Sequence, residues 1–123
     1  MKKRILVTDD DPGILDIFKI ILEKAGYEVD VISNGLEILK NHFTIPDLFI
    51  LDRQLSGVDG LDLCRFLKSR QDTAHVPVIM VSANPRLQDL SKEAGADDCL
   101  EKPFDLKNFL RMIKRYTESK LSG

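Results

Sequence analysis

The sequence predicts an α/β protein in which a doubly wound parallel sheet carries helices on both faces. Two observations lead to this fold class. Five short apolar segments alternate along the 123 residues with longer segments whose apolar residues recur at helical spacing. The short segments are mostly β-branched or aliphatic, as in strands that helices cover on both sides. Five βα units are therefore expected.

The first βα unit has well-marked boundaries. A strand is predicted over residues 4–8, and a helix follows in which Asp11 supplies the cap, Pro12 begins the first turn and Gly26 ends the last. One face of this helix is expected to be apolar, and it is formed by Ile14, Ile17, Phe18, Ile21 and Leu22.

The next two units follow the same order. Strands are predicted over residues 27–31 and 47–51, and a helix is predicted between them over residues 35–42. Asp59 is a suitable cap for a third helix that continues to about Ser69. Cys64 lies one turn beyond Leu61 on this helix and is expected to be a small core residue.

The last two units complete the pattern. Strands are predicted over residues 78–81 and 97–100, and a fourth helix is expected to have Asn84 as its cap and Pro85 as its first residue. Its apolar stripe is thin, so this helix should be held less tightly than the fifth. The stripe consists of Leu87, Leu90 and Ala94, whereas the fifth helix carries Leu106, Phe109, Leu110 and Ile113.

Composition limits the classes of function. A chain of this length fits one domain, residues 1–123, and the net charge of -2 argues against direct nucleic-acid binding. The two cysteines, Cys64 and Cys99, form no C-x-x-C pair, so neither a disulfide framework nor a zinc site is indicated. The apolar stretch after the basic N-terminus is too short for a signal peptide or a membrane span. A cytoplasmic protein is expected.

Polar side chains follow four of the five predicted strands. Asp9 and Asp10 come after the first, Asp52 after the third, Ser82 after the fourth and Lys102 after the fifth. Because ligand sites of parallel sheets lie at the carboxyl ends of the strands, these side chains should converge. Crowded carboxylates repel each other, and hard oxygen ligands of this kind suit Mg²⁺.

The same residues suit phosphoryl transfer. A carboxylate such as Asp52 can act as a nucleophile and become an aspartyl phosphate. Lys102 can neutralise charge on the phosphoryl oxygens together with the metal, and Ser82 can donate a hydrogen bond.

Several segments together resemble the receiver domains of bacterial two-component response regulators. They are residues 5–12, 46–52, 57–60, 77–83 and 95–104, which occur in the family's order and spacing over nearly the whole chain. The resemblance implies a flavodoxin-like (βα)5 fold with strand order 2-1-3-4-5. It also implies a phosphorylation switch that receives its phosphoryl group from a histidine kinase or a histidine phosphotransfer protein and acts on a downstream protein target or output domain. Such a protein is not an enzyme beyond its own phosphotransfer and slow autodephosphorylation.

The resemblance further implies roles for individual residues. Asp10 and Asp52 would be direct ligands of Mg²⁺, for which Mn²⁺ could substitute, and Asp9 would act directly or through water. The backbone carbonyl of Gln54 would complete the protein's share of the ligands. Ser82 would be the switch hydroxyl, and the bond between Lys102 and Pro103 would be cis.

Three positions depart from the family pattern, Thr8, Ser56 and Cys99, and the first of them is more commonly aliphatic. Cys99 occupies the switch position that is usually aromatic, and a thiol cannot fill the volume of a ring, so coupling through this side chain should be weakened or replaced. Gln54 and Asn84 lie where the family places residues that tune the lifetime of the phosphate. Ser56 replaces a common proline, which should loosen its loop without removing a catalytic group.

Alternatives to the phosphorylation switch remain. Charged residues of the fourth helix, fifth strand and fifth helix could form a homodimer face, although a solvated surface is the simpler interpretation. A phosphorylation-independent binding module with the same fold would lose the acidic site, and Cys99 is its main support. A haloacid dehalogenase-type phosphohydrolase would need an aspartate where Gln54 stands. A flavodoxin-like cofactor protein would need a phosphate-binding loop where the first turn is acidic.

Overall fold

The computed structural model describes residues 2–55 and 57–118, so Met1, residues 119–123 and the prediction for Ser56 lie outside the described part. Five parallel strands form one sheet in the order β2-β1-β3-β4-β5, as predicted. The strands are β1 Arg4–Thr8, β2 Glu28–Ile32, β3 Leu48–Asp52, β4 Val78–Ser82 and β5 Asp98–Glu101.

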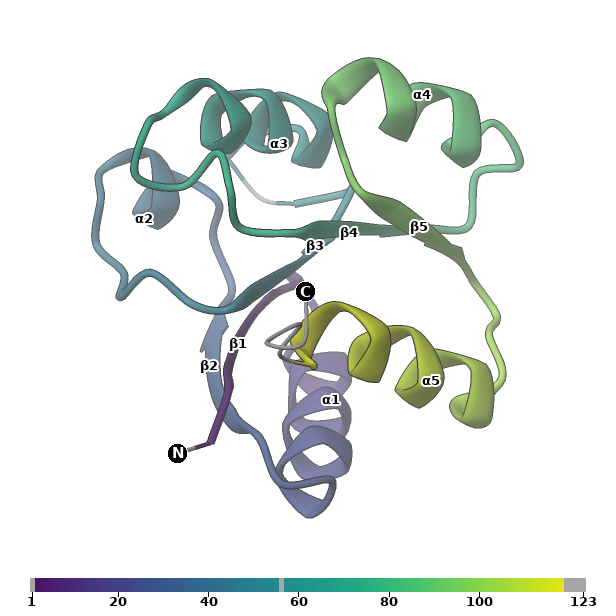
Figure 1. The fold of residues 1–123 in the computed structure, drawn as a ribbon. Helices are drawn as coiled ribbons and strands as arrows, with labels where there is room; N and C mark the ends of the chain where they lie inside the picture. Colours follow the sequence, from purple (N-terminus) through teal and green to yellow (C-terminus); the bar gives the residue numbers. More distant parts are fainter. Residues whose placement is uncertain (1, 56, 119–123) are drawn as a thin grey trace.

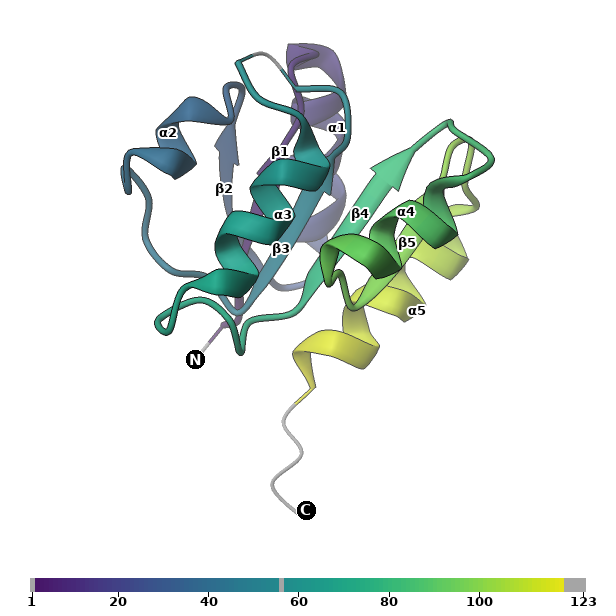
Figure 2. The same ribbon diagram turned by 90° about the horizontal axis from the view of Figure 1, so that it is seen from above.

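Helices cover both faces of the sheet (Figure 1). The helices are α1 Pro12–Lys24, α2 Leu36–Leu39, α3 Gly60–Ser69, α4 Leu87–Ala94 and α5 Leu106–Thr117. α1 and α5 lie on one face, and α2, α3 and α4 lie side by side on the other (Figure 2). No helix within the described residues is long and apolar enough to cross a bilayer.

Each face of the sheet has its own apolar core. Successive strand side chains point to opposite faces, so Ile5 packs beneath α1 and α5 whereas Leu6 packs beneath α3 and α4. The core beneath α1 and α5 contains three stacked or tilted rings, Phe18, Phe104 and Phe109, with centroids 5.2 to 6.0 Å apart. Two cores on one central sheet hold the strand ends in a common plane and thereby position the side chains that follow them.

Side-chain caps mark the starts of three helices, and at α5 Asp105 accepts a hydrogen bond from the backbone N–H of Lys107 at 3.3 Å. Asp11 accepts a hydrogen bond from the backbone N–H of Gly13 at 2.9 Å, and Asp59 accepts one from Leu61 at 2.8 Å. α1 ends before Gly26, whose φ of 100° is a left-handed conformation that glycine adopts without steric cost. The predicted limits of α1 and α3 are confirmed.

The predicted start of the fourth helix is wrong. α4 begins at Leu87 rather than Pro85, Arg86 occupies the cap position, and no side chain caps the helix. Asn84 instead accepts a hydrogen bond from the N–H of Arg86 at 2.8 Å, which closes a turn before the helix. Asparagine side chains compete in this way with a helical start, so the Asn84-Pro85 pair forms a turn rather than a cap.

Other boundaries and faces also differ. The second helix is one turn, residues 36–39, because Asn41 takes a left-handed φ of 65° in place of the predicted continuation to residue 42. β2, β3 and β5 begin one residue later than predicted, and Asp52 and Ser82 are the last residues of their strands. Ile17 and Leu106 were expected on buried helix faces, yet 57% of Ile17 and 48% of Leu106 are exposed.

Candidate functional site

Three predicted site residues meet at the carboxyl edge of the sheet. The ammonium of Lys102 lies 2.8 Å from Oδ2 of Asp52 and 3.5 Å from Oδ2 of Asp9. Both carboxylates are buried, with 6% of Asp52 and 2% of Asp9 exposed, and Lys102 is half-buried. The residues come from β3, the end of β1 and the end of β5, so the arrangement depends on the strand order β1-β3-β4-β5.

Local backbone contacts orient Asp52. Its Oδ1 accepts a hydrogen bond from the N–H of Gln54 at 2.8 Å, so each carboxylate oxygen has its own donor. Gly60 opens α3 directly against this strand end, and its N–H donates to the carbonyl of Arg53 at 2.8 Å. A Cβ at Gly60 would lie 2.2 Å from the carbonyl oxygen of Asp52, so the close approach requires glycine.

Burial and charge act together on Asp9 and Lys102. Burial and the neighbouring Asp52 raise the pKa of Asp9 to about 6, although the N–H of Asp11 and the ammonium of Lys102 oppose this shift. Burial alone would lower the pKa of Lys102, but Asp52 and Asp9 together raise it above its ordinary value. The three side chains thus hold two acids and one base, an arrangement that favours a second cation.

The predicted metal ligands differ in burial. Asp9 and Asp52 adjoin each other, whereas Asp10 is exposed, and within the described residues no three His, Cys, Asp or Glu side chains are placed to hold a metal ion. Two adjacent buried carboxylates are nevertheless hard oxygen donors, and Mg²⁺ commonly binds to one or two carboxylates and keeps several waters. The residues present therefore fit Mg²⁺ as a partly hydrated ion.

Ser82 lies beside this set. It is buried, its Oγ accepts a hydrogen bond from the N–H of Asn84 at 3.1 Å, and its carbonyl accepts one from the N–H of Lys102 at 2.8 Å. The Lys102–Pro103 peptide bond is cis, as the resemblance implied. Gln54 is exposed and Asn84 is half-buried, whereas Asp9 and Asp52 are buried.

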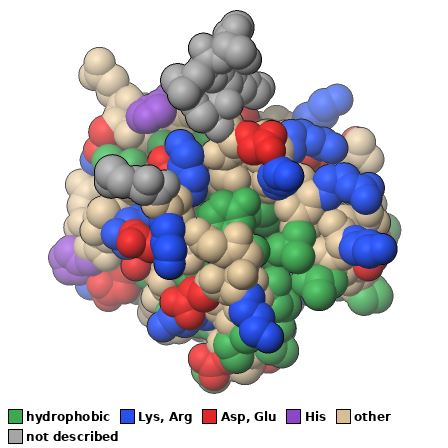
Figure 3. Space-filling view, turned by 60° about the horizontal axis from the view of Figure 1, so that its bottom comes forward, with side chains coloured by type: hydrophobic (Ala, Val, Ile, Leu, Met, Phe, Trp, Pro, Cys, Tyr) green, Lys and Arg blue, Asp and Glu red, His purple; other side chains and the backbone are tan. Residues whose placement is uncertain are grey.

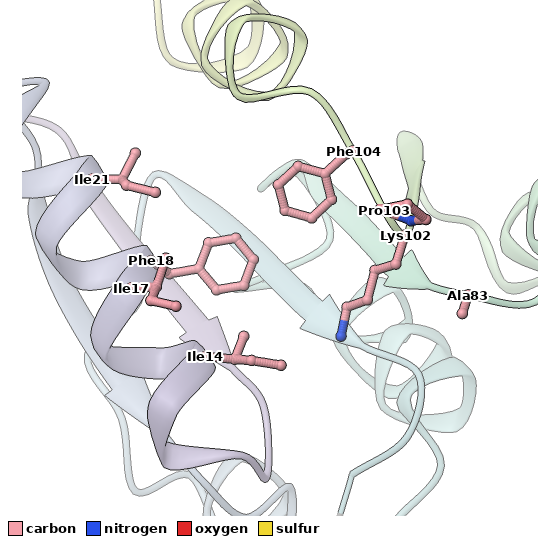
Figure 4. A pocket seen from close by; sticks show the side chains of 8 residues that line it. All are labelled: Ile14, Ile17, Phe18, Ile21, Ala83, Lys102, Pro103 and Phe104. Carbon is pink, nitrogen blue, oxygen red and sulfur yellow. The ribbon is translucent and has the colours of Figure 1, made fainter.

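An apolar groove adjoins Lys102, and the sequence interpretation missed it. Its volume is about 520 Å³. Figure 4 shows its walls, which consist of Ile14, Ile17, Phe18, Ile21, Ala83, Lys102, Pro103 and Phe104. In the view that brings α1 and α5 forward, hydrophobic side chains gather around a hollow with Lys and Arg side chains beside it (Figure 3). The isoleucines were identified as a helix face, but only the position of Phe104 opposite them reveals a groove.

Two acidic residues near α4 and α5 form ion pairs with different elements. Asp98 lies 3.7 Å from Arg115, but Asp97 pairs with Lys68 of α3 at 2.7 Å and so contributes less to a separate face. Cys64 is fully buried, as expected for a core residue, and burial raises the pKa of its thiol to about 11.

The sequence matches one protein family over most of its length: the model of the response regulator receiver domain covers residues 5–114. The chain belongs to this family. Its fold is that of CheY-like receiver domains, with five parallel strands in the order 2-1-3-4-5. As the receiver domain of a two-component response regulator it is a signalling component rather than a conventional enzyme, and receiver domains act with histidine kinases.

Individual similar proteins agree with this family. The DNA-binding dual master transcriptional regulator RpaA of Synechocystis sp. is 40% identical over 114 residues, which cover 90% of this receiver and 47% of RpaA. A CheY-like response regulator receiver domain protein of Methanospirillum hungatei JF-1 is 31% identical, with a TM-score of 0.86 and 100% of both chains covered.

A further solved structure shares the fold and holds a metal. The receiver domain of the sensor histidine kinase PA1611 from Pseudomonas aeruginosa PAO1 has a magnesium ion coordinated in its active site cleft. It is 24% identical, with a TM-score of 0.86, and covers 97% of this receiver and 100% of that chain. This receiver spans about half the length of the curated relatives that it matches, and their description as DNA-binding applies to those longer proteins.

Proposed function

We propose that this receiver is a phosphorylation-dependent switch that accepts a phosphoryl group on Asp52 from a histidine kinase or a histidine phosphotransfer protein. The observation that carries the proposal is the buried pair of Asp52 and Asp9 with Lys102 between them, at 2.8 and 3.5 Å. A carboxylate that attacks a phosphoryl group needs a neighbouring cation to neutralise the negative charge on the phosphoryl oxygens, and Lys102 is placed to do so.

The transfer uses side chains already in place. An oxygen of Asp52 forms a bond to phosphorus as the bond between phosphorus and the donor nitrogen breaks. That nitrogen keeps the electron pair of the broken bond, and the other nitrogen of the donor ring carries a proton, so a neutral imidazole leaves. Lys102 then neutralises a phosphoryl oxygen, and the Ser82 hydroxyl, whose oxygen already accepts from Asn84, remains free to donate its hydrogen. Transfer therefore changes the partners of Lys102 and Ser82.

Asp9 and Asp52, with Asp10 and the backbone carbonyl of Gln54 nearby, are the residues proposed to hold Mg²⁺, and Mn²⁺ has similar ligand preferences. The bound ion would supply positive charge for the phosphoryl oxygens. The side chains of Gln54, which is exposed, and Asn84, which is half-buried, would tune the lifetime of the phosphate, and slow autodephosphorylation would return the switch to its resting state.

The output is proposed to pass through α4, β5 and α5. Ser82 is tied to Lys102 by a backbone hydrogen bond of 2.8 Å, so a shift of one strand end moves the other. Residues 1–123 would act as one cytoplasmic domain whose surface controls a protein target or output domain, with a homodimer through this surface as one form of control. The net charge of -2 argues against direct nucleic-acid contact by these residues.

The test is chemical phosphorylation. We expect incubation with acetyl phosphate and Mg²⁺ to add one phosphoryl group to the intact protein, measured by mass spectrometry, and Asp52→Asn to remain unmodified. An adduct that persists in Asp52→Asn would contradict the assignment of the residue. No adduct on the folded wild-type protein would favour the phosphorylation-independent binding module instead.

A further inference from the structure

Two segments of the chain meet beside the strand end that carries Asp52. One is the start of α2 with the two residues before it, residues 34–36, which we call the α2 entry. The other is the β3–α3 loop, of which residues 53–55 and 57–59 are described. The helices that follow these segments, α2 and α3, lie side by side (Figure 2). A glycine on each segment allows the two to approach closely.

Gly35 of the α2 entry receives the side chain of Val58. A Cβ on Gly35 would lie 2.2 Å from Cγ1 of Val58, well inside the roughly 3.5 to 4.0 Å at which non-bonded carbon atoms meet. Gly35 is buried and has a φ of -63° and a ψ of -21°, a helical conformation that any residue can adopt. Its backbone conformation therefore does not require glycine, whereas the approach of Val58 does.

Gly57 makes the contact reciprocal. A Cβ on Gly57 would lie 2.7 Å from Oδ1 of Asn34 and 2.8 Å from Cγ of Leu36. The Asn34 side chain is itself fixed, because its Oδ1 accepts a hydrogen bond from the N–H of Leu36 at 2.8 Å. The α2 entry thus holds the β3–α3 loop at two nearby positions.

The β3–α3 loop leads directly to the Asp52 carboxylate. Val58 precedes Asp59, which pairs with Gln54 in an antiparallel bridge across the loop and caps α3 by accepting from the N–H of Leu61. The N–H of Gln54 donates to Oδ1 of Asp52 at 2.8 Å. Because the bridge joins the two sides of the loop, a displacement of Val58 also displaces Gln54.

We propose that the contact between Val58 and Gly35 positions the N–H of Gln54 against Asp52 and thereby sets the rate at which Asp52 is phosphorylated. The inference rests on the proposed function, since it takes Asp52 as the phosphoacceptor. Val58 and Gly35 are positioning residues that act through Gln54. A carboxylate oxygen must approach phosphorus in the correct orientation, so a hydrogen bond that fixes the Asp52 carboxylate favours the reaction.

A contact that served only core packing would behave differently. Val58 and Leu55 also pack against the buried residues Ile38, Leu61 and Leu63. Loss of a packing contact lowers the free energy of unfolding wherever the contact lies. Loss of a positioning contact also changes the Gln54 amide and the reaction at Asp52, so these quantities distinguish the two roles.

The test moves the contact from one residue to the other. Gly35→Ala adds a Cβ where Cγ1 of Val58 lies, and Val58→Ala removes that methyl group. We expect each single variant to react with acetyl phosphate and Mg²⁺ about fivefold more slowly, because one hydrogen bond to a carboxylate is weakened. The double variant has the added Cβ and lacks the methyl group, so its rate should return to within about twofold of the wild-type rate.

Val31→Ala is the matched control for Val58→Ala. It makes the same change at an exposed valine of β2 outside the contact, and it should leave the rate of phosphorylation unchanged.

A second measurement does not depend on phosphorylation. In the ¹⁵N-labelled protein without a phosphodonor, the amide proton of Gln54 reports its hydrogen bond to Asp52. We expect this proton to move upfield in each single variant and to return in the double variant. If the wild-type protein takes up no phosphoryl group, the proposed function is wrong, and the amide proton still decides whether Val58 and Gly35 position Gln54.

Urea denaturation of every variant completes the comparison. Additive slowing in the double variant, or an unchanged Gln54 amide in the folded single variants, would overturn the proposal. A loss of stability with no change in the amide or the rate would also overturn it and assign the contact to core packing. If Gly35→Ala does not fold, Val58→Ala is compared with Val31→Ala, and equal amide shifts and rates in these two variants would contradict the proposal.

Discussion

Two buried carboxylates face the single positive charge of Lys102, and this excess of acidic groups is the main chemical feature of the receiver. Its ammonium lies closer to Asp52, at 2.8 Å, than to Asp9, at 3.5 Å. The charged form of Asp9 is therefore the less stabilised of the two, and burial together with Asp52 raises its pKa to about 6. A group of this kind makes the binding of any further cation depend on pH.

For Asp9 the direction of the pH effect follows from its pKa, which rises from 3.8 to about 6 on folding. The folded state binds the extra proton between these values, so this group makes the protein less stable as pH rises through them. Mg²⁺ competes with the same proton. We expect its affinity to increase about tenfold between about pH 5 and about pH 7, and to change little above that.

Calorimetric titration of Mg²⁺ at these two pH values checks the prediction. Asp9→Asn keeps the shape of the side chain and removes the titrating proton, so its weaker Mg²⁺ binding should show a much flatter pH dependence. Equal pH dependence in the wild type and in Asp9→Asn would assign the proton to another group.

Other residues in and near the site could be predicted to different degrees. Asp52, Ser82 and Lys102 could be identified from sequence, because each lies at the end of an apolar strand segment. The importance of Gly60 could not be derived from spacing, since it depends on a Cβ that would meet the Asp52 carbonyl at 2.2 Å. Ser91 completes a buried stripe with Leu87 and Ala94. The sequence alone does not show that its buried hydroxyl lacks a hydrogen-bond partner in the structure.

Helix α1 packs one apolar face against the core, and a second apolar face is exposed to solvent. Phe18 is buried, whereas 57% of Ile17 and 60% of Ile20 are exposed. Ile17 lines the groove next to Lys102, and Ile20 does not (Figure 4). A protein that delivers a phosphoryl group to Asp52 must lie close to this groove, so α1 is expected to provide part of its docking surface.

We therefore expect Ile17→Ser to slow phosphotransfer from a phosphorylated histidine kinase about tenfold. An apolar side chain that becomes buried when the partner docks contributes about 1 to 2 kcal/mol to such contacts. Phosphorylation by acetyl phosphate should be unchanged, because that donor needs no docking surface. Transfer kinetics followed by mass spectrometry provide the measurement.

Ile20→Ser is the matched control, as it makes the same change on the same helix outside the groove. Equal slowing by both variants would indicate a general effect on α1, and slowing with acetyl phosphate as donor would indicate damage to the site itself.

The fourth helix shows how a turn can replace an expected cap. Asparagine followed by proline is a strong local signal, yet the signal is compatible with either a helix start or a turn. The N–H of Arg86 binds the Asn84 side chain, and the helix begins only at Leu87. Local sequence does not resolve this choice, which depends on the path that the chain must take from β4 back across the sheet.

At the level of the whole molecule, the sheet joins two cores that differ in composition. The α1 and α5 side contains the cluster of Phe18, Phe104 and Phe109, and Phe109 is completely buried. Phe104 follows the Lys102–Pro103 segment, so this core also supports the chain that carries the site lysine.

Phe109→Ala should therefore lower the free energy of unfolding by about 3 to 5 kcal/mol, the usual cost of truncating a buried aromatic ring. Urea denaturation checks the value. Leu106→Ala is the control on the same helix, since 48% of Leu106 is exposed, and it should cost less than about 1 kcal/mol. A similar loss in both variants would show that helix propensity rather than ring packing dominates.

The sequence by itself determined the α/β class, the five strands, the caps of α1 and α3, and the strand-end residues Asp9, Asp52, Ser82 and Lys102. These follow from periodicity and local backbone chemistry, which neighbouring residues carry. Only the tertiary structure decided that Lys102 lies within reach of both Asp9 and Asp52, and that α1 and Phe104 enclose a groove. It also placed an unpaired Ser91 hydroxyl beside a small cavity between α4 and β5. Such features depend on distances between residues far apart in the chain, which packing sets and local sequence does not.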